Sequence, residues 1–327
     1  MFNTQNLSHL VGVAKELATG NHDTTAAVAD LTFDSNCNLT RGRAALKLTD
    51  YAMGQVCDRL GPPPRRYIKQ CPPHIQSVNL EHWRHQLVAQ NPDAQWLVRG
   101  HNRTCRALLS TRYVPLDNQP LLETVSGVLA DTSYTLVAHH LDGDSMHLRL
   151  TMANSPDGYY AAGVFVANSE IGQRSITLAP FVQRHSCANS IVHLDGGVRQ
   201  RHVRVTPAFI WGLITEKVGQ CFGLAQDMIE RAVWAQAQQL PDVGDVIRKL
   251  CEAKGYTEDT QANILMGTEG QHTRMGLVNG LSAAARDFEN PDQRLVLESM
   301  AGAILVETDP VWSVIQKRVK AKAEVEA

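Results

Sequence analysis

The sequence contains cysteines but lacks the close cysteine spacing that zinc or disulfide chemistry uses. None of its seven cysteines belongs to a C-x-x-C pair. They are Cys37, Cys57, Cys71, Cys105, Cys187, Cys221 and Cys251. Structural zinc sites and redox dithiols place cysteines in such pairs, and structural disulfides belong to oxidising compartments. We therefore expect buried free thiols and predict neither a metal site nor a cofactor.

Long apolar runs are also missing. No segment approaches the roughly 18 consecutive apolar residues of a membrane-spanning helix. Residues 1–20 combine neither a basic start nor a continuous apolar stretch, as a secretory signal would. These two absences predict a protein without membrane contact that works in the cytoplasm.

Three motifs of common enzyme classes are absent. The chain has no G-x-G-x-x-G, no G-x-x-x-x-G-K-[ST] and no G-x-S-x-G. The first two bring backbone N–H groups against phosphates, and the third exposes a nucleophilic serine at a strand-to-helix turn. Their absence argues against dinucleotide chemistry, P-loop NTP hydrolysis and α/β-hydrolase chemistry.

The patterns that are present predict helices, then strands, then helices again. Caps and helical spacing indicate helices before residue 95, and the apolar period then changes to two, which is typical of strands. A second helical region begins at Thr206-Pro207, a cap with proline at the first helical position. The expected helices are 5–18, 50–60, 78–89, 119–130, 207–239, 242–254, 257–266, 273–286 and 291–305, with a charged tail from about 311. The expected strands are 96–99, 104–110, both arms of a hairpin in 134–152, 159–167, and the run with Ile176, Leu178 and Val182.

This order predicts an α+β fold, an antiparallel sheet of hairpins with preceding helices and a helical C-terminal region. Three regions are expected. Residues 1–45 form a polar N-terminal segment, 46–205 the α+β core with its sheet, and 206–327 a helical region packed on that core.

One predicted strand alternates strictly between apolar and polar side chains. The apolar members are Met146, Leu148, Leu150 and Met152, and the polar ones are His147, Arg149 and Thr151. Such alternation is typical of a sheet with one buried and one solvated face. The same argument places Arg99, Arg106 and Arg149 on a face exposed to solvent.

Arginine is concentrated in the middle of the chain. Residues 51–205 carry 15 basic against 11 acidic side chains, and 14 of the 15 are arginines. Guanidinium groups suit phosphate oxygens, and aromatic rings beside them can stack bases. The pattern favours a groove for single-stranded nucleic acid, formed by Trp96, Arg99, Arg103, Arg106, Arg112, Tyr113, Arg149, Arg184, Arg199, Arg201 and Arg204. The alternative is a solvated face with scattered cation–π pairs.

The stretch NSEIGQRSITLAPFVQRHSCANS, residues 168–190, suggests a different class of site. On a strand, His185 and Cys187 would share a face, and Glu170 stands earlier in the same stretch. Together they are candidates for an enzyme site of unknown substrate. Catalytic Cys–His pairs usually come from separate elements, so packing is the favoured role of Cys187. Ser169 and Glu170 are expected to cap backbone N–H groups in a polar turn.

Four segments carry a resemblance to a known family. They are LTDYAMGQVCDRLGPPPRRY, WLVRGHNRTCRALLSTRYVPLDN, VANSEIGQRSITLAPFVQRHSCANSIV and RHVR. The resemblance runs in consistent order from about residue 33 to residue 305. These segments resemble the phage/plasmid-like proteins grouped as domain of unknown function 932. The chain departs from that pattern at Ser190, where the family usually has glycine.

The resemblance implies a setting in phage, prophage or plasmid but no established chemistry. At the level of architecture alone, the chain resembles single-strand annealing proteins. The leading hypothesis is a DNA-associated protein that binds single-stranded nucleic acid without NTP hydrolysis, in recombination or strand annealing, as a homo-oligomer. The alternatives are the Cys/His enzyme and a protein-interaction factor, such as a modulator of host defence, that acts through the acidic helical C-terminal half.

Overall fold

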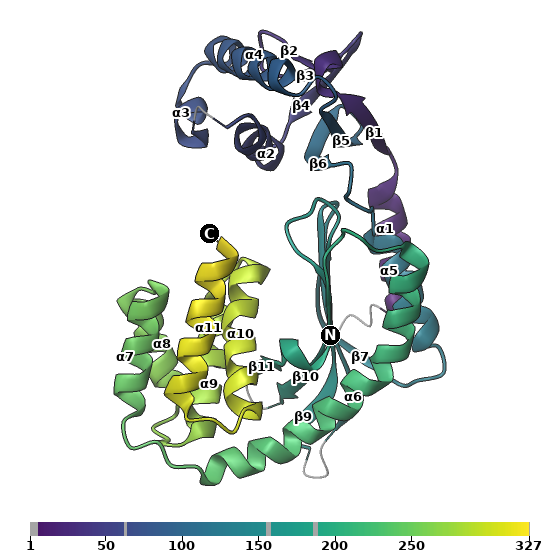
Figure 1. Cartoon of the computed structure of the whole chain (residues 1–327). Helices are drawn as coiled ribbons and strands as arrows, with labels where there is room; N and C mark the ends of the chain where they lie inside the picture. The colour runs from purple at the N-terminus through teal and green to yellow at the C-terminus, as the bar shows by residue number, and fades with distance from the viewer. Residues whose placement is uncertain (1–5, 62–63, 155–157, 186–188, 327) are drawn as a thin grey trace.

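The protein has an α+β fold with two six-stranded sheets, which confirms the predicted class. The computed structural model describes residues 6–61, 64–154, 158–185 and 189–326. The first sheet lies with helices α2–α4 at one end of the molecule, and the second sheet lies between α5–α6 and the C-terminal helices (Figure 1).

The first sheet contains six short strands and holds the predicted hairpin of β5 and β6. Its strand order is β1-β5-β6-β4-β3-β2, with β4 parallel to β6 and the other pairs antiparallel. The strands are β1 (Asn21–Ala27), β2 (Thr32–Phe33), β3 (Leu39–Arg41), β4 (Ala44–Leu48), β5 (Gln95–His101) and β6 (Thr104–Ser110). One face packs on α2 (Asp50–Leu60) and α4 (Pro73–Gln90), with α3 (Arg65–Gln70) between these helices in the chain.

The ends of α2 follow the predicted signals. The Thr49 hydroxyl accepts a hydrogen bond from the Ala52 N–H at 3.1 Å, and Gly61 ends the helix at φ 85°. Glycine adopts this positive φ without the Cβ clash that other residues suffer.

The N-terminal region takes part in both halves of the fold. Helix α1 (Leu7–Ala18) packs on α5 (Asn118–Val128), and residues 21–41 supply β1, β2 and β3 to the first sheet. The predicted boundary between residues 45 and 46 falls inside β4. The strand β1 gave little signal because six of its seven residues are not fully buried.

The second sheet is antiparallel and is built on long central strands. Its order is β11-β10-β9-β8-β7, and β12 pairs with β10. The strands are β7 (Thr135–Leu141), β8 (Ser145–Asn154), β9 (Tyr160–Ser169), β10 (Ile176–Arg184), β11 (Asn189–Val192) and β12 (Val198–Gln200). The four predicted strands β7–β10 are confirmed, whereas β11 and β12 are too short to show a period.

Both faces of the second sheet are covered, which corrects the predicted solvent face of β8. Met146, Leu148 and Leu150 pack on α1, α5 and the first half of α6 (Pro207–Ala237). On the opposite face, His147 and Arg149 are only 1% and 4% exposed. This face lies beside α10 (Pro291–Val306), whose Leu295 packs on the Phe165 cluster (Figure 1). An alternating sequence shows only that the two sides of a strand differ chemically. In this sheet neither side of β8 is exposed to solvent.

The C-terminal helices share a core with the sheet. They are α7 (Val243–Lys254), α8 (Glu258–Gly267), α9 (Arg274–Ala284), α10 and α11 (Val311–Glu326). The shared core includes Tyr160, Val182 and Ile191 from the second sheet. Helix α11 occupies the region predicted only as a charged tail. Among the described residues, no helix combines the length and apolar character needed to cross a membrane.

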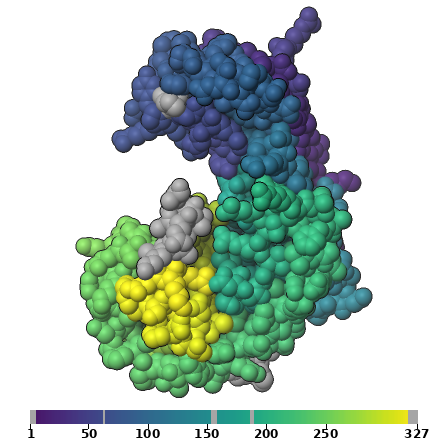
Figure 2. Space-filling view, in the orientation of Figure 1, coloured from purple at the N-terminus to yellow at the C-terminus, as the bar shows by residue number. Residues whose placement is uncertain are grey.

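An open notch separates the two ends of the molecule. Helices α2–α4 project beyond the first sheet to the side on which the C-terminal helices lie, and the surface is hollowed between these two groups of helices (Figures 1 and 2).

Candidate nucleic-acid interface

Arg99 and Arg106 of the first sheet are buried in ion pairs with carboxylates from several elements. Arg99 on β5 is 1% exposed. Its Nη2 lies 2.7 Å from Asp117 Oδ1, its Nε lies 3.1 Å from Asp23 Oδ1, and its Nη1 donates to the backbone carbonyl of Glu170. Arg99 therefore links β1, β5, the start of α5 and the end of β9.

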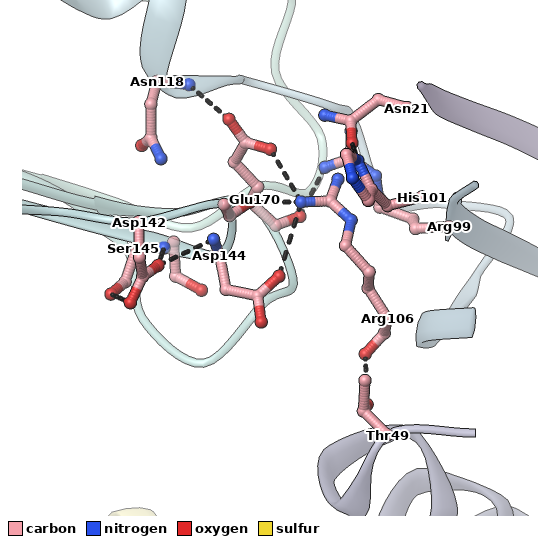
Figure 3. A network of polar contacts seen from close by, with 12 residues as sticks. Asn21, Thr49, Arg99, His101, Arg106, Asn118, Asp142, Asp144, Ser145 and Glu170 are labelled. Atoms are coloured by element: carbon pink, nitrogen blue, oxygen red, sulfur yellow. Dashed lines mark hydrogen bonds and ion pairs between the residues drawn. The ribbon is translucent and has the colours of Figure 1, made fainter. Parts of the chain in front are cut away.

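Arg106 on β6 makes a parallel set of contacts (Figure 3). Its Nη1 lies 3.1 Å from Glu170 Oε2 and 3.3 Å from Asp144 Oδ1, and it donates to the Gly143 carbonyl. The other oxygen of Glu170 accepts a hydrogen bond from the Asn118 N–H at 2.9 Å. We call Asp23, Arg99, Arg106, Asp117, Asp144 and Glu170 the sheet joint, because they hold the first sheet against the second.

The sheet joint carries more carboxylates than guanidinium groups. Burial raises the pKa of both Glu170 and Asp144 above their ordinary values, against the opposing effect of Arg106. Burial alone would lower the pKa of Arg99, but the carboxylates of Asp117 and Asp23 raise it above its ordinary value. The two carboxylates therefore stabilise the charged form of the Arg99 guanidinium.

Four further predicted residues, Trp96, Tyr113, Arg149 and Arg184, are buried as well. Arg149 pairs with the fully buried Glu298 on α10. Arg184 Nη1 lies 3.1 Å from Glu269 Oε1, and its guanidinium lies over the Tyr159 ring at 5.0 Å. Trp96 is 5% exposed in the core of the first sheet, and Tyr113 is 9% exposed. The prediction that these side chains face solvent is wrong, because helices and turns cover them. The arginines among them form ion pairs with carboxylates.

Four other predicted arginines are exposed and flank one backbone bridge. Arg112 precedes Tyr113, and Arg199, Arg201 and Arg204 lie around Val203. Tyr113 and Val203 form an antiparallel bridge, and the Val114 N–H donates to the His202 carbonyl at 2.7 Å. In the part of the chain that the structure describes, none of these four guanidinium groups has an ion-pair or hydrogen-bond partner. We call Arg112, Arg199, Arg201 and Arg204 the arginine strip.

The strip borders two hollows. The first, of about 570 Å³, is lined by Arg112, Arg204, Val114, Val205, Thr206 and Phe209, and we call it the strip hollow. Phe209 in the first turn of α6 is 59% exposed. The second, of about 640 Å³, includes Arg199 and Arg201 in its lining, and we call it the junction cavity. Each hollow combines guanidinium groups with apolar surface.

Arg103 is exposed but does not belong to the strip. It lies in the tight turn between β5 and β6, next to Asn102 at φ 52°. The strip and Arg103 are the exposed members of the predicted set.

The structure does not bring the candidate enzyme residues together. Glu170 follows the last residue of β9, whereas His185 follows Arg184, which pairs with Tyr160 at the first residue of β9. A strand rises by about 3.3 Å per residue, so the two side chains lie roughly 30 Å apart. Cys187 lies outside the described residues. The hypothesis of an enzyme site with Glu170 beside His185 is therefore wrong.

The predicted capping role of the polar turn is confirmed. The Ser169 hydroxyl accepts from the Gln173 N–H at 3.2 Å, and Glu170 caps the Asn118 N–H. Gly172 follows at φ 81°, where an added Cβ would lie 3.1 Å from Leu109 of the first sheet. The turn is part of the contact between the sheets and is not a reactive centre.

The predicted binding set leaves out several residues that border the hollows. Arg174, His202 and Asp292 line the junction cavity, and Phe209 lines the strip hollow. His202 stands inside the segment VRQRHVR. Its arginine neighbours are the sequence signal that could have placed it in the binding set. Asp292 and Arg174 are 118 residues apart in the chain, and no local pattern links them.

No group of three or more histidine, cysteine or acidic side chains suited to a metal ion is found among the residues described. No family model, curated protein or solved structure matched the chain.

Proposed function

We propose that this protein binds single-stranded nucleic acid at the arginine strip, without NTP hydrolysis. The observation that carries the proposal is the contrast in ion pairing. Arg112, Arg199, Arg201 and Arg204 are exposed and unpaired in the described structure, while the buried arginines of both sheets are neutralised by carboxylates. Exposed guanidinium groups are the groups that phosphate oxygens can reach.

The strip hollow supports a single strand over a duplex. Arg112 and Arg204 border it together with the exposed ring of Phe209. In a single strand the base faces are free, so a base can pack on Phe209 while its phosphates contact the two arginines. A duplex keeps its base faces stacked and offers only its backbone to such a hollow.

The resemblance to phage/plasmid-like proteins supports the setting of this proposal. In that setting the chain would act in the cytoplasm on the DNA of a mobile element, in recombination or strand annealing, and as a homo-oligomer. Cooperative assembly along a strand is common among single-strand binders.

Fluorescence anisotropy with labelled single- and double-stranded oligonucleotides tests the proposal. If the four arginines each contact one phosphate, the slope of log affinity against log salt should be about −3 for single strands. Binding that is weak at low salt, or equal for single and double strands, would contradict the proposal.

The matched variants are Arg112→Glu with Arg204→Glu and, as control, Arg41→Glu with Arg43→Glu. Both pairs are exposed and change the net charge equally. The first pair should reduce single-strand affinity by about a hundredfold, because two attractive contacts become repulsive. The control pair near β3 should change it far less.

A further inference from the structure

The junction cavity has the features of a binding site for a phosphate monoester. It lies where three parts of the fold meet. Its lining includes Leu109 and Tyr113 beside the first sheet, Arg174 in the turn between β9 and β10, and Asp292 on α10. Its volume of about 640 Å³ falls within the range of about 300–1,000 Å³ that is typical of small-ligand sites.

The charge of the lining is strongly positive. Arg174, Arg199 and Arg201 contribute three guanidinium groups, and the carboxylate among the lining residues belongs to Asp292. The Arg174 Nη2 pairs with Asp292, whereas its Nε and Nη1 are buried and have no partner among the described residues. One carboxylate therefore faces three cations, and an anionic occupant would balance them.

His202 adds a second observation. It is 3% exposed, and neither ring nitrogen makes a hydrogen bond of normal geometry in the described structure, although the Val114 backbone lies near enough to act on the pKa of the ring. Its ring stacks on Tyr113 at 5.0 Å. Burial and the nearby Arg99 lower the pKa of His202 to about 4. A neutral, buried imidazole with unpaired nitrogens lacks the hydrogen bonds that water would give it, and an oxygen-rich ligand can supply them.

We infer that the junction cavity binds a terminal phosphate group, either at the end of a nucleic-acid strand or on a free mononucleotide. As a strand-end site it rests on the proposed function, because Arg199 and Arg201 belong to both the arginine strip and the cavity. A phosphate within a strand carries sugars on both sides, whereas a terminal phosphate can enter a cavity and presents a further negative charge to its arginines.

Asp292 acts in this site as an internal competitor. It is bound to Arg174, yet its side chain is 49% exposed, so it can leave the guanidinium without unfolding α10. An incoming phosphate takes the place of the carboxylate on Arg174. Removal of the charge at Asp292 should therefore strengthen phosphate binding, a gain that a damaged fold does not produce.

The experiment measures anisotropy with single strands that carry a 5′-phosphate, a 3′-phosphate or only hydroxyl ends, in competition with a free nucleoside monophosphate. We expect one phosphorylated end to bind about tenfold more tightly than the hydroxyl-ended strand. Asp292→Asn should increase this preference several-fold. Arg174→Gln should abolish it, measured for the variant against its own affinity for hydroxyl-ended strands and with a thermal melt to confirm that it is folded.

The outcomes separate this inference from the proposed function. If hydroxyl-ended strands bind with the expected salt dependence but no end is preferred in wild type or in Asp292→Asn, the cavity assignment is wrong and the strip remains. If strands do not bind but the free monophosphate does, more tightly in Asp292→Asn than in wild type, the cavity is a mononucleotide site and the strip proposal fails. If neither probe binds, both are wrong.

Discussion

Two sets of arginines from the same part of the chain have opposite environments. Arg99, Arg106, Arg149 and Arg184 are at most 7% exposed, and each meets a carboxylate. Arg112, Arg199, Arg201 and Arg204 are exposed. The first set lies on strands that are covered on both faces, whereas the second lies on the short strand β12 or in the connections beyond strand ends. An arginine's neighbours along the chain do not show whether it binds a ligand or holds the fold together.

The partners of the buried set come from distant positions. Arg149 meets Glu298 from 149 residues away, and Arg106 meets Glu170 from 64 residues away. Each pair holds two elements in one geometry, so these arginines support the surface on which the exposed set is displayed. Four experiments test this division, in order of decreasing expected effect.

The largest effect is expected for Arg106→Met in the sheet joint. The substitution leaves the buried Glu170 and the partly exposed Asp144 without the Arg106 cation, which should lower the free energy of unfolding by about 3–5 kcal/mol, mainly through Glu170. Urea denaturation followed by circular dichroism measures the change. Arg103→Ala, on an exposed arginine of the adjoining turn, is the control and should stay within about 0.5 kcal/mol of wild type. Similar losses of unfolding free energy in the two variants would contradict the distinction between buried, paired arginines and exposed ones.

The second experiment is a double-mutant cycle on Arg149 and Glu298. Arg149→Met alone leaves the fully buried Glu298 with only the half-exposed Arg294 beside it and should cost about 3 kcal/mol. The double variant Arg149→Met with Glu298→Leu removes both charges and should recover most of that loss. Losses that simply add would show that the two side chains do not act as a pair.

The third experiment measures how stability depends on pH in wild type and in a variant in which a side chain that cannot titrate replaces His202. Well above pH 6.5 the imidazole is neutral in both folded and unfolded chains, so its contribution is fully present. The unfolded chain takes up a proton below about pH 6.5, while the folded chain, with a pKa of about 4, does so only at lower pH. Stability should therefore fall by about 2 kcal/mol between pH 6.5 and 5 through this group alone.

The measurement is the free energy of unfolding of wild type and His202→Phe at several pH values. The difference between the two proteins should be constant above pH 7 and change by the expected amount below it. His147, whose pKa burial lowers to about 2, remains in both proteins and cancels from the comparison. A difference that does not depend on pH would place His202 in a solvated environment instead.

The smallest effect is expected for Arg201→Ala in the arginine strip. Because this side chain is exposed and unpaired in the described structure, the free energy of unfolding should change by no more than about 0.5 kcal/mol. Loss of one phosphate contact should reduce the salt slope of single-strand binding by about 0.7. Arg103→Ala should leave the slope unchanged, since Arg103 lies apart from the strip.

Much of the fold could be predicted from local patterns, but the side-chain environments could not. The caps at Thr49 and Thr206 and the alternation of β8 locate elements because they report local backbone geometry. The strands β1–β4, β11 and β12 were missed, since most are short and their polar residues hide any period. Of the eleven predicted binding residues, four form the strip, and three of these came from the segment VRQRHVR, where arginines stand close together.

The sequence by itself determined the α+β class, the antiparallel hairpins, most of the longer helices, and the high arginine content of residues 51–205. Only the tertiary structure decided which arginines are neutralised. Helix α10 and the turn after β9 bring Glu298 and Glu170 against Arg149 and Arg106, while no described carboxylate pairs with the strip. Burial and ion pairing depend on contacts between residues far apart in the chain, and those contacts exist only once the layers have packed.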